Sequence, residues 1–204
     1  KILEIGSNDS TLLNLFYNDG FNCAWIDPAE NLNSEHENVI SDFFNMDITD
    51  KVLAKYGKFD LIFGLNVFAH NDSFIDMFKA VNKLLEKSGT FIFDVAYAKQ
   101  TILKGNFDTI YHEHVCSYTL TSLINALSFA EMTVVDVEEL TSQGGSLRLT
   151  CKKSESNYQV QDRVNNLLKQ EIELGYQSAE FYENISSLIE NKVLNINNFF
   201  EKNI

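Results

Sequence analysis

Apolar and polar positions follow two different periods along the first half of the chain. Short runs of β-branched and apolar residues, typical of buried strands, alternate with segments whose apolar residues recur every three or four positions, as in amphipathic helices. The pattern predicts strands at residues 1–5, 22–26, 39–41, 59–65 and 90–95. It predicts helices at residues 11–17, 47–56 and 72–86, the last closed by Gly89. This alternation indicates a mainly parallel, doubly wound α/β sheet.

The second half begins with an irregular stretch and then resumes regular patterning. A helix is predicted at residues 120–129, and strands at 132–137 and 146–151, the second preceded by a Gly144-Gly145 turn. From about residue 158 the composition is polar with helical periodicity. The expected fold is therefore a Rossmann-like, mostly parallel seven-stranded sheet with an antiparallel last strand, followed by a helical tail. The expected domains are residues 1–153 and a helical connector over residues 154–204.

Composition narrows the classes of partner. The net charge of −13 argues against a nucleic-acid partner, because phosphate binding needs clustered Lys and Arg. The longest apolar stretch, residues 59–69, contains Asp60 and Asn66 and is too short to span a bilayer. No membrane partner is therefore expected, and a small-molecule substrate remains.

The cysteines and the first residue bear on the compartment and the extent of the chain. Cys23, Cys116 and Cys151 follow no CxxC spacing, so we expect neither disulfides nor a zinc knuckle. They are typical of small buried residues in a reducing compartment, which predicts a cytoplasmic location. The chain opens at Lys1 directly on a predicted strand, so we expect a fragment of a longer protein. Its oligomeric state does not follow from the sequence.

A loop of small polar residues, Gly6-Ser7-Asn8-Asp9-Ser10, follows the first predicted strand. Glycine lets the backbone approach a ligand, and the next helix, with Ser10 or Thr11 as N-cap, offers free N–H groups. The loop is not GxGxxG, which disfavours a nicotinamide dinucleotide. The carboxylates of Glu4 and Asp9 would repel a pyrophosphate but suit a cationic, amine-bearing ligand. S-adenosylmethionine, with its sulfonium and ammonium groups, is such a ligand.

Acidic residues also end the next two predicted strands. Asp27, followed by Pro28, lies 21 positions after Gly6, the spacing at which a carboxylate meets ribose hydroxyls. Asp42, followed by Phe43, ends the third strand, where a side chain can reach an adenine amino group. A lone glycine turn is more often an ordinary strand-to-helix loop. Three acidic strand ends in the right order favour a cofactor site instead.

Chemistry of another kind is concentrated in the run Tyr111-His112-Glu113-His114. Histidine suits the role of general base, tyrosine can donate a hydrogen bond to an oxyanion, and a carboxylate can fix a histidine tautomer. Together they could remove a proton beside a ketone, as carbon methylation requires. A metal site is disfavoured, because His112 and Glu113 would point to different faces of an extended run. His70, after the fourth strand, could equally cap a helix or satisfy a backbone group.

Several motifs together resemble those of sugar C-methyltransferases that act on nucleotide-linked keto-deoxysugars. The resemblance runs from Lys1 to about Phe200 and rests on EIGSNDSTLL, IDPAEN, DFFN, NVFAH, FDTIYHEH and GGSLRLT. It implies a class I methyltransferase fold, S-adenosylmethionine as cofactor with S-adenosylhomocysteine as product, and a nucleotide-sugar substrate. Ser10 departs from the family, which usually has Gly at this position.

The resemblance also implies roles for particular residues. Tyr111, Glu113 and His114 match the family's sugar pocket, with His114 as the favoured base, and His70 matches another pocket histidine. Arg148, in GGSLR, is a candidate contact only. The catalytic residues expected are His114, Tyr111, Glu113 and His70. The cofactor-binding residues expected are Glu4, Gly6, Ser7, Asn8, Asp9, Asp27, Pro28, Asp42, Phe43 and Asn66, with no metal site.

Two family regions are expected outside this chain. One is a cysteine-rich zinc module before the first strand, so zinc is expected only there. The other is a second Rossmann-like region after the helical tail. Two alternative functions remain open from the sequence: a small-molecule O- or N-methyltransferase, and an S-adenosylmethionine-binding domain without catalysis.

Overall fold

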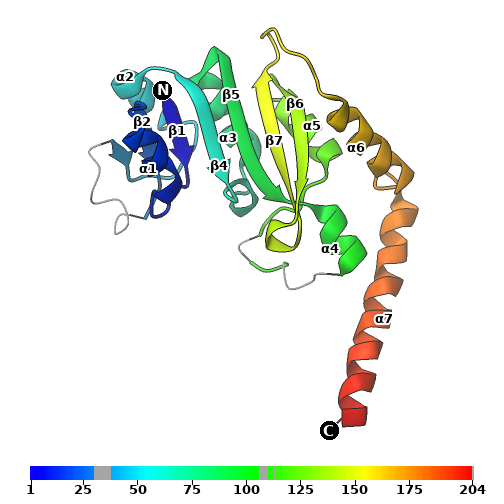
Figure 1. Cartoon of the computed structure of the whole chain (residues 1–204). Helices are drawn as coiled ribbons and strands as arrows, with labels where there is room; N and C mark the ends of the chain where they lie inside the picture. Colours follow the sequence, from blue (N-terminus) through cyan, green and yellow to red (C-terminus); the bar gives the residue numbers. More distant parts are fainter. Residues whose placement is uncertain (30–37, 106–109, 113, 204) are drawn as a thin grey trace.

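The computed structural model describes residues 1–29, 38–105, 110–112 and 114–203. It contains a central sheet with helices on both faces and a long final helix that extends away from it (Figure 1). The elements in chain order are β1 (Ile2–Ile5), α1 (Thr11–Asn18), β2 (Cys23–Ile26), β3 (Val39–Ile40), α2 (Thr49–Tyr56), β4 (Phe59–Leu65), η1 (Phe68–His70), α3 (Phe74–Leu84), β5 (Leu85–Ala96), α4 (Ala98–Lys104), α5 (Leu120–Ser128), β6 (Met132–Leu140), η3 (Ser142–Gly144), β7 (Ser146–Lys153), α6 (Asp162–Glu173) and α7 (Ala179–Asn203).

The sheet has seven strands in the order β3-β2-β1-β4-β5-β7-β6. The five strands from β3 to β5 are parallel to one another, and β7 runs antiparallel to both β5 and β6. The predicted sheet with its antiparallel last strand is thus confirmed. Strand order reverses between β1 and β4, so the loops after these strands diverge at the place where doubly wound sheets bind ligands.

Side chains of the central strands alternate between two cores. Leu3 and Ile5 of β1 belong to a large core shared with α2, α3, α5 and α6, whereas Ile2 packs with Trp25 in a smaller core under α1. Among the described helices, α1 therefore covers one face of the sheet, and the larger group covers the other. Because both faces of these strands are buried, they consist of short, mostly apolar runs, and such runs located the strands in the sequence.

The predicted helix over residues 72–86 ends earlier than its pattern indicates. Helix α3 stops at Leu84, and β5 begins at Leu85, which is fully buried and pairs with Phe59. Gly89 therefore does not close the helix, as predicted, but lies inside β5. Burial of Leu85 in the sheet outweighs its helical propensity, because propensity differences are a fraction of a kcal/mol whereas burying a leucine contributes about 1.5–3 kcal/mol.

The irregular stretch after residue 95 contains a helix that its pattern did not indicate. Helix α4 spans only Ala98–Lys104 and ends at Gly105, which has φ 63°. A helix this short has no complete apolar stripe, so tertiary contacts rather than periodicity define it.

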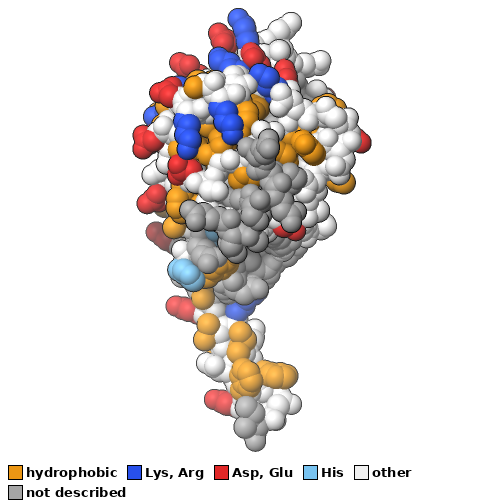
Figure 2. All heavy atoms as spheres, turned by 90° about the vertical axis from the view of Figure 1, so that its left-hand side faces the viewer, with side chains coloured by type: hydrophobic (Ala, Val, Ile, Leu, Met, Phe, Trp, Pro, Cys, Tyr) orange, Lys and Arg blue, Asp and Glu red, His pale blue; other side chains and the backbone are white. Residues whose placement is uncertain are grey.

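The predicted helical tail consists of two helices with different surroundings. Helix α6 places Val164 and Leu167 in the large core, against β6 and α5. Helix α7 extends away from the sheet, and Figure 2 shows hydrophobic side chains on its exposed surface. The exposed large apolar residues there are Tyr182, Ile189, Val193, Leu194, Ile196, Phe199 and Phe200.

Candidate active site

The parallel strands bring the predicted cofactor residues to one edge of the sheet. Gly6 follows β1, Asp27 follows β2, Asp42 follows β3 and Asn66 follows β4, and these strands are neighbours in the sheet. Because parallel strands end at the same edge, the four positions are adjacent even though they are spread over the first third of the chain.

The loop after β1 is held by tight backbone geometry. Gly6 has φ 69°, and a Cβ placed there would lie 2.4 Å from Val67 Cγ2. Asn8 has φ 46°, and its N–H donates to Asp27 Oδ2 at 2.8 Å. The other oxygen, Asp27 Oδ1, accepts from the Ala29 N–H at 2.8 Å. The buried Asp27 carboxylate thus joins the first loop to the end of β2.

The N-cap of α1 is one of the two predicted residues, but its side chain does not cap the helix as expected. Ser10 occupies the N-cap in the left-handed conformation, with φ 59°, and its side chain makes no capping hydrogen bond. The Asp9 carboxylate accepts from the Thr11 N–H at 3.1 Å instead. The left-handed backbone explains why glycine suits this position and why the serine hydroxyl does not reach the helix as expected.

Two buried polar atoms, one in β1 and one in the loop after it, have no hydrogen-bond partner among the described residues. These are Glu4 Oε2 and Ser7 Oγ. Burial raises the pKa of Glu4 to about 8; a hydrogen bond from the Leu13 backbone lowers it, and the charges of Asp9 and Asp27 raise it. Hydrogen bonds from Thr11 hold the pKa of the exposed Asp9 carboxyl below its usual range. With a pKa of about 8, Glu4 is mostly protonated at neutral pH, so the edge offers a cationic ligand the unpaired Glu4 and Ser7 oxygens together with the negative charges of Asp9 and Asp27.

Stability is expected to depend on pH through Glu4. Its pKa is raised from 4.5 to about 8 in the folded state, so the folded protein binds this proton more tightly than the unfolded chain. The contribution is fully present below pH 4.5 and is lost as pH rises towards 8, by up to about 1.4 kcal/mol per pH unit. The free energy of unfolding is measured with urea at about pH 5, 6, 7 and 8. It should fall as pH rises in the native chain but not in Glu4→Gln.

The matched control for this titration is Glu183→Gln, which alters an exposed carboxylate of α7. It should keep the native dependence of the free energy of unfolding on pH. If the free energy of unfolding depends on pH equally in the native chain and in Glu4→Gln, Glu4 is not the group responsible.

The remaining predicted cofactor residues lie around the same edge. The Phe43 side chain is 69% exposed, beside Asp42, whose Oδ1 accepts from the Phe43 N–H at 2.8 Å. Pro28 is also exposed. Asn66 has φ 57°, and its N–H donates to the carbonyl of Asp94 in β5 at 3.2 Å. The exposed phenyl ring gives this edge an apolar surface at the position expected to meet an adenine.

Three of the predicted catalytic residues lie together, although one of them is far from the others in sequence. The Tyr111 hydroxyl and His114 Nε2 are 3.1 Å apart, and the two ring centroids are 4.3 Å apart. The His70 ring lies 5.0 Å from the His114 ring. The His112 ring contacts Tyr111 at a larger centroid distance, 6.1 Å. Glu113, the fourth predicted residue, lies outside the described residues.

Backbone contacts attach this cluster to the cofactor edge. His70 ends η1, which begins one residue after Val67, the neighbour of Gly6. The Val115 N–H donates to the Ala69 carbonyl at 3.1 Å, and the Tyr118 hydroxyl donates to the Phe68 carbonyl at 2.8 Å. The histidines therefore lie on segments that are fixed to the end of β4.

Arg148 lies in the sheet and is held by an acidic partner. Its Nε and one terminal nitrogen each donate to the buried Asp94 carboxylate at 2.9 Å. The pair spans neighbouring positions of β5 and β7. Arg148 also lines a mainly apolar groove of about 410 Å³ with Leu12, Phe16, Leu61, Phe63, Leu65 and Ile92.

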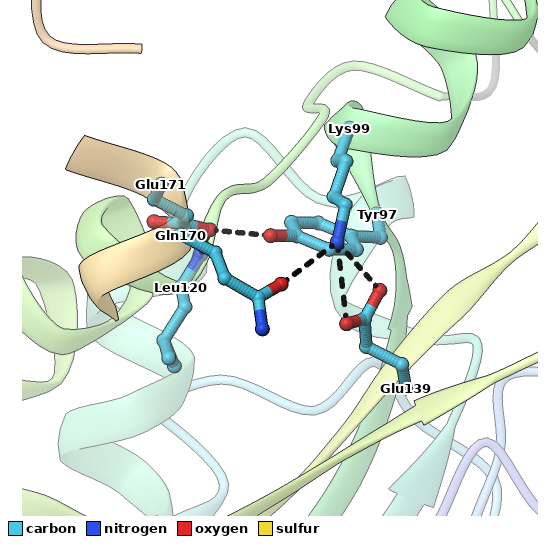
Figure 3. Close-up of polar contacts among 6 residues, drawn as sticks. All are labelled: Tyr97, Lys99, Leu120, Glu139, Gln170 and Glu171. Atoms are coloured by element: carbon cyan, nitrogen blue, oxygen red, sulfur yellow. Dashed lines mark hydrogen bonds and ion pairs between the residues drawn. The ribbon is translucent and has the colours of Figure 1, made fainter. Parts of the chain in front are cut away.

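Two residues near the site were not singled out by the sequence. Tyr97, directly after β5, is 1% exposed, and its hydroxyl donates to Glu171 Oε1 of α6 at 2.9 Å (Figure 3). Glu171 lies one turn after the buried Leu167, on the same stripe of α6. An acidic residue on an apolar helix stripe is a signal that could have identified it, because a buried carboxylate requires partners.

Within residues 1–29, 38–105, 110–112 and 114–203, no group of three or more His, Cys, Asp or Glu side chains could hold a metal ion. No helix in that part of the chain is long and apolar enough to cross a membrane.

The strand order and the acidic strand ends define a class I methyltransferase type of α/β domain. The chain belongs to the family described as methyltransferase domain, which matches residues 1–137, and the C-methyltransferase C-terminal domain matches residues 141–203. The resemblance inferred from the motifs is thereby confirmed at the level of the C-methyltransferase family.

Individual relatives agree with this assignment. The chain is 28% identical over 193 residues to the C-methyltransferase NovU of Streptomyces niveus. The matched region is 93% of this chain and 46% of NovU. The chain thus spans less than half the length of this relative. Among solved structures, an S-adenosylmethionine-dependent methyltransferase from Clostridium acetobutylicum has a TM-score of 0.57 at 18% identity, covering 74% of this chain and 82% of that one.

A second solved structure is the 1,6-didemethyltoxoflavin-N1-methyltransferase of Burkholderia thailandensis with bound 1,6-didemethyltoxoflavin and S-adenosylhomocysteine. Its TM-score is 0.56 at 17% identity, covering 76% of this chain and 71% of that one. At these identities the likeness of both structures concerns the fold.

Proposed function

We propose that the edge formed by the ends of β1 to β4 binds S-adenosylmethionine. The support is the unpaired Glu4 Oε2 and Ser7 Oγ, the close backbone approach at Gly6 and the negative charge of Asp9 and Asp27. These groups match an ammonium and a sulfonium better than a pyrophosphate. The residues that would hold the cofactor are Glu4, Gly6, Ser7, Asn8, Asp9, Asp27, Pro28, Asp42, Phe43 and Asn66. When bound, it supplies the methyl group as an electrophile.

The reaction we infer is methylation of a carbon next to the keto group of a nucleotide-activated deoxysugar. The observation that carries this inference is the cluster of His70, Tyr111 and His114. A C–H bond becomes nucleophilic carbon only after a base removes its proton and the resulting enolate oxygen is stabilised. Methylation of oxygen or nitrogen forms no enolate, so a cluster that can both remove a C–H proton and stabilise an enolate oxygen favours carbon as the acceptor.

Each member of the cluster has a role in this reaction. In the tautomer with its proton on Nδ1, His114 Nε2 accepts from the Tyr111 hydroxyl. When the substrate binds, this hydroxyl turns to donate to the substrate oxygen, which leaves the Nε2 lone pair free to take the substrate proton. As His114 takes the proton, the C–H electron pair passes into the enolate. The enolate carbon would then form the new bond to the methyl group as the methyl–sulfur bond breaks, and the electron pair of that bond would remain on the sulfur of S-adenosylhomocysteine. Tyr111 and His70 position the substrate oxygen and stabilise its charge. Glu113 would orient His114 or bind a sugar hydroxyl.

Solvent exchange tests this reaction in the full-length protein. A nucleotide-linked keto-deoxysugar is incubated in D₂O with the enzyme and S-adenosylhomocysteine, so that deprotonation can occur without methyl transfer. We expect deuterium at the carbon next to the keto group, and a new C-methyl group when S-adenosylmethionine replaces the product. Both are detected by mass spectrometry and NMR.

The same experiment distinguishes the alternatives. Methylation at oxygen or nitrogen without deuterium incorporation would indicate the O- or N-methyltransferase. Tight binding of S-adenosylhomocysteine with neither exchange nor methylation across a panel of keto-deoxysugars would indicate a binding domain. Binding of NAD in place of S-adenosylhomocysteine would refute the cofactor assignment.

A further inference from the structure

The stretch that carries Tyr111 and His114 has its two ends side by side. Tyr97 and Tyr118 form an isolated parallel bridge, and the Ala98 N–H donates to the Tyr118 carbonyl at 2.8 Å. The chain therefore leaves the sheet after β5 and returns to the same place before α5. A contact that fixes the Tyr97–Tyr118 bridge therefore also limits where the residues between them can lie.

A single buried carboxylate binds both Tyr97, at the first end of this stretch, and the first turn of α5, just after its second end. Glu171 is 0% exposed, and its Oε1 accepts from the Tyr97 hydroxyl at 2.9 Å and from the Leu120 N–H at 2.6 Å (Figure 3). Its Oε2 accepts from the Thr121 N–H at 2.8 Å and from the Thr121 hydroxyl at 2.6 Å. Glu171 thus caps the first turn of α5 and holds Tyr97 at the same time.

A second polar link joins the first end to the same helix. Lys99 Nζ lies 3.1 Å from Glu139 Oε2 and 3.3 Å from Gln170 Oε1, beside the Tyr97 ring (Figure 3). Burial and the charge of Glu171 raise the pKa of Tyr97, so its hydroxyl stays protonated and donates. The start of the stretch is therefore attached to α6 by two adjacent residues, Gln170 and Glu171.

The second end of the stretch is hydrogen-bonded to η1, the element that carries His70. Tyr118 donates to the Phe68 carbonyl and Val115 to the Ala69 carbonyl, so both are bound to η1, which ends at His70. The His114 N–H donates to the Tyr111 carbonyl at 3.0 Å. Displacing the Tyr97–Tyr118 bridge would strain or break these two bonds to η1, and Tyr111 and His114 would then shift relative to His70.

We propose that Glu171 is a positioning residue, which sets the placement of Tyr111 and His114 relative to His70 by binding Tyr97 and the first turn of α5 together. Its effect on catalysis rests on the function proposed above, whereas its effect on the backbone does not. Glu171 belongs to the region that matches the C-methyltransferase C-terminal domain, and Tyr97 to the region that matches the methyltransferase domain. The C-terminal region thus has a part in organising the site.

Two conservative variants test the proposal in the full-length protein. Tyr97→Phe removes only the hydroxyl that links the first end, and it leaves the cap of α5 intact. Glu171→Gln keeps the size of the side chain, but its NH₂ must face an N–H of Leu120 or Thr121, so one bond is lost. The matched control is Glu173→Gln, on the exposed side of α6.

Hydrogen–deuterium exchange is measured first, without any substrate. In Tyr97→Phe and Glu171→Gln we expect faster exchange at the amides of Ala98, His114 and Val115, with the amides of β4 and β5 unchanged. Glu173→Gln should match the native protein. Faster exchange throughout the sheet would show a merely structural role and overturn the proposal, as would unchanged exchange at those three amides.

Turnover is measured next with the keto-deoxysugar. We expect kcat to fall about tenfold or more in both variants, because a displacement of about 1 Å can cost a hundredfold. The Kd of S-adenosylhomocysteine should stay within about twofold, well below the tenfold that 1.4 kcal/mol would give. An unchanged kcat would overturn the proposal. If the native protein methylates no such sugar but the exchange pattern is as expected, the proposed function fails and the positioning role stands.

Discussion

Replacing His114 with asparagine is expected to lower kcat for carbon methylation about 10²–10⁴-fold, the usual contribution of a general base. Asparagine can still hydrogen-bond to Tyr111, but it cannot take a proton at neutral pH. Because His114 lies beside His70 and Tyr111 rather than in the loop after β1, binding of the cofactor should not change. Steady-state kinetics of the full-length enzyme and calorimetric titration with S-adenosylhomocysteine measure the two quantities separately.

His112→Asn is the matched control, because His112 is an exposed histidine in the same run and its ring is farther from the Tyr111 ring than that of His114. It should retain most of the activity. Deuterium incorporation from D₂O should be lost in His114→Asn and kept in His112→Asn. Methylation at a near-native rate in His114→Asn would favour the O- or N-methyltransferase instead.

Replacing Gly6 with alanine is expected to weaken binding of S-adenosylhomocysteine at least tenfold, about 1.4 kcal/mol. The new Cβ would lie 2.4 Å from Val67 Cγ2, so the loop or the end of β4 must move. The free energy of unfolding should also fall, by about 1–2 kcal/mol for a Cβ in the left-handed conformation and by about 1–3 kcal/mol for overpacking. Calorimetry and urea unfolding measure the two effects.

Two further variants separate the collision from the backbone strain. Gly20 has φ 87° and nothing within 4 Å of its Cβ position, so Gly20→Ala should carry only the cost of the left-handed conformation. The double variant Gly6→Ala with Val67→Ala removes the colliding methyl group and should recover part of the lost affinity. Equal affinity losses in Gly6→Ala and Gly20→Ala would contradict the role of the Gly6–Val67 contact.

The fold was largely predictable because its local and global preferences agree. Strand side chains alternate between the two cores, and the parallel strands end at one edge, so the acidic residues at strand ends could be assigned to one site in advance. The two errors of the prediction, the end of α3 and the missing α4, have a common cause. Leu85 continues the helical pattern but is buried in β5, and α4 is too short for a period, so tertiary contacts decided both.

In the loop after β1, the local sequence predicted the kind of turn but not its capping hydrogen bonds. Its composition predicted a tight turn with glycine and acidic groups, and the structure contains one. Ser10 has a left-handed φ and makes no side-chain cap, and the Asp9 carboxylate accepts from the Thr11 N–H instead. Residue types alone do not determine such a conformation.

The sequence by itself determined the order and type of the main elements, the acidic edge and the residue types of the catalytic run. These depend on local periodicity and on the direction of parallel strands. The family resemblance assigned His70 and His114 to one pocket, but only the tertiary structure decided the contact between their rings and the hydrogen bond between Glu171 and Tyr97, 74 positions apart. Such contacts join segments that are distant in the chain, so they depend on tertiary packing and not on local periodicity.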